Sequence, residues 1–131
     1  MTIELGYLAA SIVLVFVQLM LPAMISTHER GTAWNTGPRD APVPPLQGVG
    51  GRLERAFRNV METFPLFVAA VLVAHAAGVH SWLTVAGASL YFWGRVIYVP
   101  LYALGIPYAR SLVWVAATSG IFLVLLALVV K

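Results

Sequence analysis

The sequence predicts an all-α integral membrane protein that folds as a four-helix bundle. Of its 131 residues, 60% are hydrophobic and only 10% are charged, and the mean hydropathy is +0.87. Soluble globular domains contain about 25% charged residues, so this composition is typical of a chain that is solvated by lipid. The chain also holds four long apolar runs. We therefore expect membrane lipid around the helices and no nucleic-acid partner.

Each apolar run is long enough to cross a bilayer, because a hydrocarbon core of about 30 Å needs about 20 helical residues. The second run, which starts at Phe64, reaches this length when it is extended back through Leu53. The expected transmembrane helices are residues 5–25, 53–78, 82–104 and 109–130. Nothing divides the chain further, so we expect one domain that covers residues 1–131.

The first run is expected to remain in the protein as a helix. It lacks the basic start of a signal peptide, carries Glu4 instead, and is long for the apolar core of such a peptide. Residues 26–52, which follow it, are rich in glycine and proline without a helical period, and this pattern predicts a loop. The other two connections are short and therefore join antiparallel neighbours.

The positions of the cations predict the orientation of the chain. Arginines surround the first loop and occur in the third, whereas the second loop has no Lys or Arg. Lys131 is the one Lys or Arg on the side of the membrane where the second loop and the termini lie. The positive-inside rule therefore predicts that loops 1 and 3 are cytoplasmic and both termini outside. The compact chain without targeting extensions favours a bacterial inner membrane.

Polar side chains gather on one face of the second helix, in the stretch LERAFRNVMETFPLF. Their spacing of i, i+3, i+4 and i+7 places them within an arc of about 100° on a helix. They are Arg55, Arg58, Asn59 and Glu62. On the third helix, the same relation predicts a polar face made of Tyr91, Arg95, Tyr98 and Tyr102. Both faces occupy the cytoplasmic half of the membrane.

Cations outnumber acids in this half of the membrane. The acids are Glu62 and, at the rim, Glu54. The cations are four arginines: Arg55, Arg58, Arg95 and Arg110. An arginine within hydrocarbon costs about 2.5–3.5 kcal/mol at a helix centre, so such residues usually face a bundle interior or a wet cavity. A purely structural network of ion pairs tends to balance its charges. The surplus therefore predicts a pocket for an anion with more than one acidic group.

Simpler interpretations compete with this one at several positions. Arg30, Arg39 and Arg52 are typical of topology signals that reach lipid headgroups. The tyrosine stripe is equally typical of an interfacial aromatic belt. Histidines 28, 75 and 80 favour structural roles, and no spacing in the chain predicts a metal site. Gln18 is a candidate member of the polar interior. The chain has no cysteine, so thiol chemistry would use a substrate's sulfur.

Two motifs resemble a known family. ERAFRNVMETFPLF resembles the second-helix signature of the membrane-associated proteins in eicosanoid and glutathione metabolism (MAPEG), and GRVIYVPLYALGIPYARS is similar to the family's third-helix Arg–Tyr segment and following loop. The resemblance implies four-helix subunits that assemble as homotrimers, with glutathione held between neighbouring subunits on the cytoplasmic side. It implies glutathione contacts from Arg55, Arg58, Asn59, Glu62, Arg95 and Tyr98, and catalytic roles for Arg110, Ser111 and Tyr102.

The implied function is that of a glutathione transferase or peroxidase involved in detoxification. A cysteine thiol has a reference pKa of about 8.5, so only a few per cent is ionised at neutral pH. Arg110, with a hydroxyl group from Ser111 or Tyr102, is the means available to stabilise the thiolate. The thiolate would then attack a lipophilic electrophile or reduce a lipid hydroperoxide.

Two alternatives come from other functional classes. A non-catalytic binding or scaffold protein would keep the fold and an anionic ligand without activating the thiol. A small multidrug transporter is disfavoured, because the first helix lacks a membrane-embedded acid and a cation-lined pocket suits anions.

Overall fold

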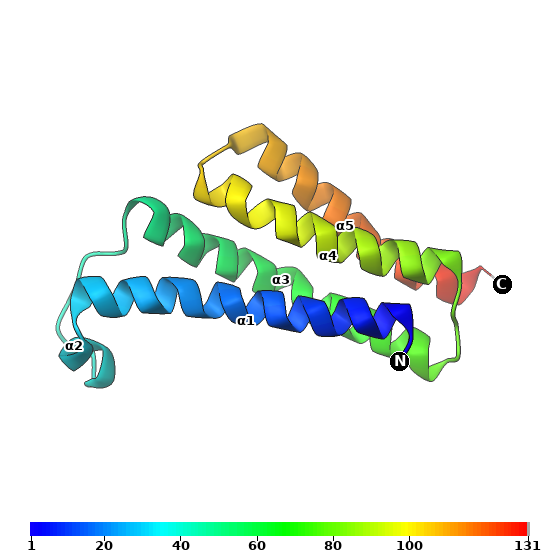
Figure 1. Ribbon diagram of the computed structural model, residues 1–131, viewed down its shortest axis with the longest axis horizontal. Helices are drawn as coiled ribbons and strands as arrows, with labels where there is room; N and C mark the ends of the chain where they lie inside the picture. Colours follow the sequence, from blue (N-terminus) through cyan, green and yellow to red (C-terminus); the bar gives the residue numbers. More distant parts are fainter. Residues whose placement is uncertain (131) are drawn as a thin grey trace.

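The structure, a computed structural model, describes residues 1–130 of the chain, and these residues form helices and connections without a strand (Figure 1). Lys131, the one cation that runs against the predicted orientation, lies outside the described residues. The helices are α1 (Ile3–Arg30), α2 (Thr32–Thr36), α3 (Gly48–Ala76), α4 (Trp82–Ala103) and α5 (Pro107–Val129). The fold class is therefore all-α, as predicted.

Three helices, α1, α3 and α5, are long and apolar enough to cross a membrane. The sequence predicts four spans, and α4 is the helix that is not among the three. It has 22 residues, but it carries Arg95 and several tyrosines. A membrane crossing by α4 therefore stays a prediction.

The first loop differs from the expectation at both ends. Helix α1 continues to Arg30 instead of ending at residue 25, and α3 begins at Gly48 instead of residue 53. The short helix α2 lies in between. Apolar residues mark where a helix lies in lipid, whereas its ends depend on backbone caps. Helix α1 stops only at Gly31, which has a φ of 88° and donates its backbone N–H to the carbonyl of Thr27.

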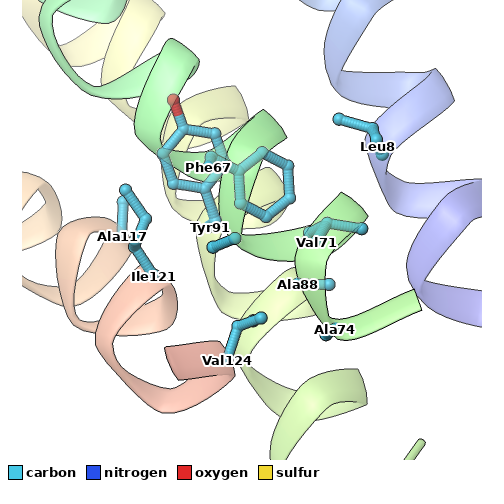
Figure 2. Packing of buried hydrophobic residues seen from close by; sticks show 10 residues of the cluster. Leu8, Phe67, Val71, Ala74, Ala88, Tyr91, Ala117, Ile121 and Val124 are labelled. Carbon is cyan, nitrogen blue, oxygen red and sulfur yellow. The ribbon is translucent and has the colours of Figure 1, made fainter. Parts of the chain in front are cut away.

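Helices α1 and α3 run side by side, and α4 and α5 form an antiparallel pair beside them (Figure 1). The buried core lies where the helices meet (Figure 2). At its centre the rings of Phe67 on α3 and Tyr91 on α4 are stacked, with 4.0 Å between their centroids. The hydroxyl groups of Tyr91 and Thr63 are hydrogen-bonded at 3.1 Å. The aromatic pair thus connects the apolar core to the more polar half of the molecule.

Small residues allow α4 and α5 to approach each other closely. Gly87 on α4 faces Gly120 on α5, and further along α4 Gly94 faces Ala117 on α5. A Cβ atom at Gly120 would collide with the backbone carbonyl of Gly87. Small residues at such crossings are typical of helix packing within membranes, where close backbone approach replaces the hydrophobic driving force.

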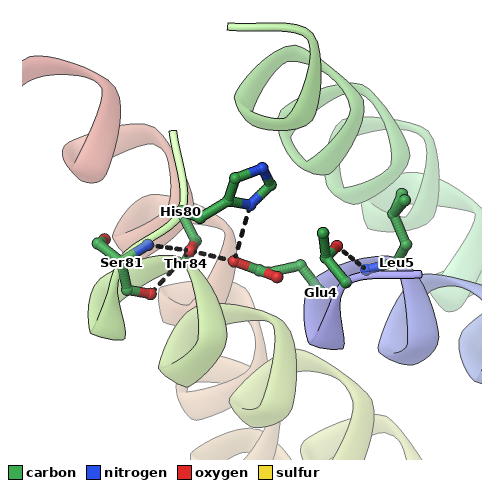
Figure 3. Close-up of polar contacts among 6 residues, drawn as sticks. Glu4, Leu5, His80, Ser81 and Thr84 are labelled. Carbon is green, nitrogen blue, oxygen red and sulfur yellow. Dashed lines mark hydrogen bonds and ion pairs between the residues drawn. The ribbon is translucent and has the colours of Figure 1, made fainter. Parts of the chain in front are cut away.

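The N-terminus of α1 is fixed to α4 by a buried carboxylate (Figure 3). Glu4 is 6% exposed, and its Oε1 accepts a hydrogen bond of 2.5 Å from the hydroxyl group of Thr84. The Nδ1 of His80 lies 3.5 Å from the same oxygen. Thr84 also accepts a hydrogen bond from the backbone N–H of Ser81, which caps α4. These contacts connect residues that are 80 positions apart in the chain.

We expect Gly120→Ala to lower the free energy of unfolding by about 1–3 kcal/mol, because the new methyl group meets backbone that cannot rotate away. Gly6→Ala is the matched control, since a Cβ at Gly6 has open space around it and alanine favours a helix. Thermal unfolding in detergent measures both variants. An equal effect of the two substitutions on stability would contradict the close approach of α4 and α5.

Thr84→Val should also lower the free energy of unfolding, by about 1–3 kcal/mol, because it leaves the buried Glu4 without its hydroxyl donor. Ser119→Ala removes a hydroxyl group that bonds only to its own helix, at Val115, and serves as the control. If the two variants unfold with the same free energy, the contact between α1 and α4 contributes nothing to stability.

Candidate functional site

The buried guanidinium group of Arg95 is the central feature of the polar half. Arg95 lies on α4 and is 1% exposed. Its Nη1 donates a hydrogen bond of 2.9 Å to Oδ1 of Asn59 on α3. Its guanidinium carbon lies 4.3 Å from the ring centroid of Tyr98, one helical turn further along α4. Within the described residues, its Nε and Nη2 are buried and have no hydrogen-bond partner.

Arg110, in the first turn of α5, stands over a second tyrosine. Its guanidinium carbon lies 4.5 Å from the ring centroid of Tyr102. The rings of Tyr98 and Tyr102 are 5.6 Å apart. Two cations and two aromatic rings therefore form a continuous row, and the ring faces attract the guanidinium groups. The row joins the end of α4 to the start of α5.

Arg110 lines two pockets. The rim pocket has a volume of about 190 Å³. Its lining consists of Arg52, Arg55, Tyr102, Arg110 and the turn 105–107. The side pocket has a volume of about 240 Å³. Its lining consists of Asn59, Tyr98, Arg110, Ser111, Trp114 and Val115. One cation thus lies between a strongly basic cavity and a second cavity that combines polar side chains with the exposed Val115.

Comparison with known families decides the classification of the chain. Residues 7–130 match the model of the MAPEG family. The chain belongs to the MAPEG family. This family includes glutathione transferases and peroxidases as well as non-catalytic members. Comparisons with curated proteins and with solved structures gave no match.

In this MAPEG chain, two of the expected ligand residues lie away from the pockets. Arg58 and Glu62 are exposed on α3 and line neither the rim pocket nor the side pocket. Arg58, whose side chain is 69% exposed, forms an ion pair with Glu54 at 3.1 Å. Both residues therefore lie on the outer surface of the described chain.

The other expected residues come together in one region. Asn59, Arg95 and Tyr98 share hydrogen-bond or ring contacts. Arg110 and Ser111 line the side pocket, and Arg55 and Tyr102 line the rim pocket. The hydroxyl group of Ser111 is exposed, and its hydrogen bond to the carbonyl of Pro107 is long, at 3.4 Å. This hydroxyl group is therefore free to turn toward a ligand.

Two pocket residues are absent from the expected site. The sequence favours a topology signal at Arg52, but its Nε donates a hydrogen bond of 2.8 Å to the carbonyl of Ala103 and its side chain lines the rim pocket. It precedes Arg55 by three positions, a spacing that places both on one helix face. Trp114 lines the side pocket and follows Ser111 by three positions. The same helical spacing could have identified it.

The predicted surplus of positive charge is present around the pockets. Among residues 1–130, the ion pairs within 4.0 Å are Arg58 with Glu54 and His80 with Glu4. In that part of the chain, the pocket residues Arg52, Arg55 and Arg110 have no such carboxylate, and neither has Arg95, which contacts the side-pocket residues Asn59 and Tyr98. A buried charge without a counter-ion is costly. The arrangement favours binding of an anion.

Gln18 on α1 is a further buried polar group. It is 3% exposed, and neither of its amide atoms has a hydrogen-bond partner within the described chain. It lines neither of the two pockets. The sequence named it as a candidate for the polar interior, and the structure buries it.

Two substitutions at Asn59 test the electrostatics of Arg95 without a ligand. Asn59→Leu should lower the free energy of unfolding by about 1–3 kcal/mol, because it leaves Nη1 of Arg95 buried without an acceptor. Asn59→Asp has nearly the same shape and adds a counter-ion, so it should be at least as stable as the wild type. Thermal unfolding of both variants checks this. Equal destabilisation would mean that the charge of Arg95 is already balanced.

Proposed function

We propose that this MAPEG protein is a membrane-bound glutathione-dependent transferase or peroxidase that works as a homotrimer. The observation that carries the proposal is the uncompensated guanidinium group of Arg95, which lies in one region with Arg110 and Ser111. Glutathione offers the complementary groups: two carboxylates for arginines, an ammonium for a carboxylate, and a thiol. Arginine and carboxylate form strong charge-assisted hydrogen bonds.

The sizes of the pockets support a site that is shared between subunits. Pockets for small molecules usually enclose about 300–1,000 Å³. The rim and side pockets of one chain, at about 190 and 240 Å³, are each smaller. The exposed Arg58 and Glu62 lie on the neighbouring face of α3. In the proposed trimer, a second subunit covers this face, and Glu62 accepts the ammonium group of glutathione.

The proposed chemistry depends on a thiolate held near Arg110. The cation and the hydroxyl groups of Ser111 and Tyr102 stabilise the charge on sulfur, and each unit of pKa depression corresponds to about 1.4 kcal/mol. In the transferase reaction, the thiol proton leaves to solvent, sulfur forms a bond to an electrophilic carbon, and the bond from that carbon to its leaving group breaks, so that the leaving group departs with the electron pair. In the peroxidase reaction, sulfur attacks one oxygen of the hydroperoxide, the O–O bond breaks, and the other oxygen leaves as the alcohol after taking a proton. The sulfenic acid formed on glutathione then reacts with the thiol of a second glutathione, which gives the disulfide and water.

The proposal includes four membrane crossings. The polar residues Tyr91, Arg95 and Tyr98 of α4 are buried. Its exposed residues Leu90, Trp93 and Ile97 are large and apolar. This arrangement supports α4 as the fourth span of a four-helix bundle, with lipid on its outer face. In this arrangement loops 1 and 3 face the cytoplasm, and the membrane is the bacterial inner membrane.

The second candidate function is glutathione binding without catalysis. Ser111 favours this alternative, because the hydrogen bond of its hydroxyl group in the described chain is to the backbone carbonyl of Pro107. A protein of this kind would bind glutathione with the thiol still protonated. Proton release on binding therefore separates the two candidates.

Calorimetric titration of the solubilised protein with glutathione, repeated in buffers of different ionisation enthalpy, tests both. We expect binding with net proton release at neutral pH. Arg95→Met should bind about tenfold more weakly or worse, which corresponds to about 1.4 kcal/mol. Arg110→Gln should bind but release fewer protons. Lys131→Gln, which removes one cation at the chain terminus, is the charge-matched control.

Asn59→Asp provides a check that does not depend on how well Arg95→Met folds. Its carboxylate competes with glutathione for Arg95, so affinity should fall although the fold is kept. Unchanged affinity in Asn59→Asp and Arg95→Met would refute the proposed site. Wild-type binding without proton release would favour the non-catalytic alternative.

A further inference from the structure

A second cationic site, far from Arg95 in the sequence, lies in the first loop. Two arginines stack on the same indole ring: the guanidinium carbon of Arg30 is 5.0 Å from the centroid of Trp34, and that of Arg39 is 5.4 Å from it. The indole N–H of Trp34 donates to the carbonyl of Ala41. The ring is therefore held in place, and it positions both cations at the end of α1.

The charges of both arginines are uncompensated in the described chain. Neither has a carboxylate within 4.0 Å among residues 1–130. Arg30 donates to Ser26 and to the carbonyl of Pro44, while its Nε is buried without a partner. Arg39 donates to the backbone and side-chain oxygens of Asn35. All of these acceptors are neutral, so the positive charge remains available to an anion.

The backbone of Arg39 is unusual. Its φ of 59° makes it the one non-glycine residue with positive φ in the described range. A side chain is unfavourable in this left-handed region, and such residues gather at functional sites. The bonds to Asn35 hold Arg39 in this conformation and keep its guanidinium group over Trp34.

A groove continues from the two cations along the first helix. It has a volume of about 250 Å³. Its apolar part includes Leu19 and Pro22 on α1 and Phe57 on α3. Leu19 precedes Arg30 by eleven positions, which is about 16 Å of helix. Glu54 also lines the groove, but its carboxylate is paired with Arg58. The groove therefore has a cationic top and an apolar floor.

We propose that this groove binds an anionic phospholipid, with the headgroup phosphate between Arg30 and Arg39 and an acyl chain along Leu19 and Pro22. Planar guanidinium groups bind phosphate oxygens in a bidentate manner. Basic pockets between membrane helices bind anionic headgroups, and tryptophan is enriched at the membrane–water interface, where the headgroups lie. Two uncompensated cations repel the ammonium group of a zwitterionic lipid, so the site prefers a lipid with net negative charge.

Native mass spectrometry of the full chain in detergent, titrated with phosphatidylglycerol and with phosphatidylcholine, tests the assignment. The wild type should retain phosphatidylglycerol in preference to phosphatidylcholine. Arg39→Gln should weaken phosphatidylglycerol binding about fivefold, because one cation near a membrane surface contributes about 1 kcal/mol. Arg52→Gln is the matched control, since it removes one cation of the rim pocket but none from this groove. Circular dichroism checks the helix content of each variant.

Three results would overturn the proposal. The first is equal retention of the two lipids by the wild type. The second is an equal loss of phosphatidylglycerol in Arg39→Gln and Arg52→Gln, which would mean that only the overall surface charge matters. The third is binding of glycerol phosphate as tight as that of phosphatidylglycerol, which would mean that the apolar floor takes no part. Selective loss in Arg39→Gln, with weak binding of glycerol phosphate, supports it.

Discussion

Burial of the Arg95 guanidinium group constrains the arrangement of the helices around it. A cation inside an apolar assembly needs polar contacts, and Asn59 of α3 and the ring of Tyr98 supply them. Helix α4 must therefore turn this face inward, toward α3. Its glycines Gly87 and Gly94 then face α5, and its large apolar residues remain on the outside. One charged residue thus accounts for the rotation of a helix whose composition alone does not mark it as a span.

In the proposed function, the same group links stability to ligand binding. Asn59 offers a neutral oxygen, so the charge of Arg95 is solvated but not neutralised. An anion that binds there removes the cost of the buried charge and binds the folded state selectively, which stabilises it. Arg110 extends this logic, because it borders both the basic rim pocket and the side pocket. In the proposed reaction this arrangement would bring a water-soluble thiol and a lipid-soluble acceptor to one cation.

Sequence patterns predicted the parts of the structure that depend on local periodicity. The apolar runs indicated the long helices, and the i, i+3, i+4 spacing placed Asn59 on the polar face of its helix. Hydropathy failed at the ends of α1 and α3, because it reports on contact with lipid and not on backbone capping. Contacts between distant residues were also beyond reach. Nothing in the sequence pairs Glu4 with Thr84. The ion pair of Glu54 with Arg58, by contrast, has the i, i+4 spacing of a local helix pair.

A crystal structure of the protein with bound glutathione would test the central claim most directly, because the claim concerns where one charge finds its counter-ion. The account predicts a glutathione carboxylate within hydrogen-bond distance of Arg95, with the sulfur beside Arg110 and Ser111. A glutathione molecule bound elsewhere, with Arg95 still contacting only Asn59 and Tyr98, would contradict it.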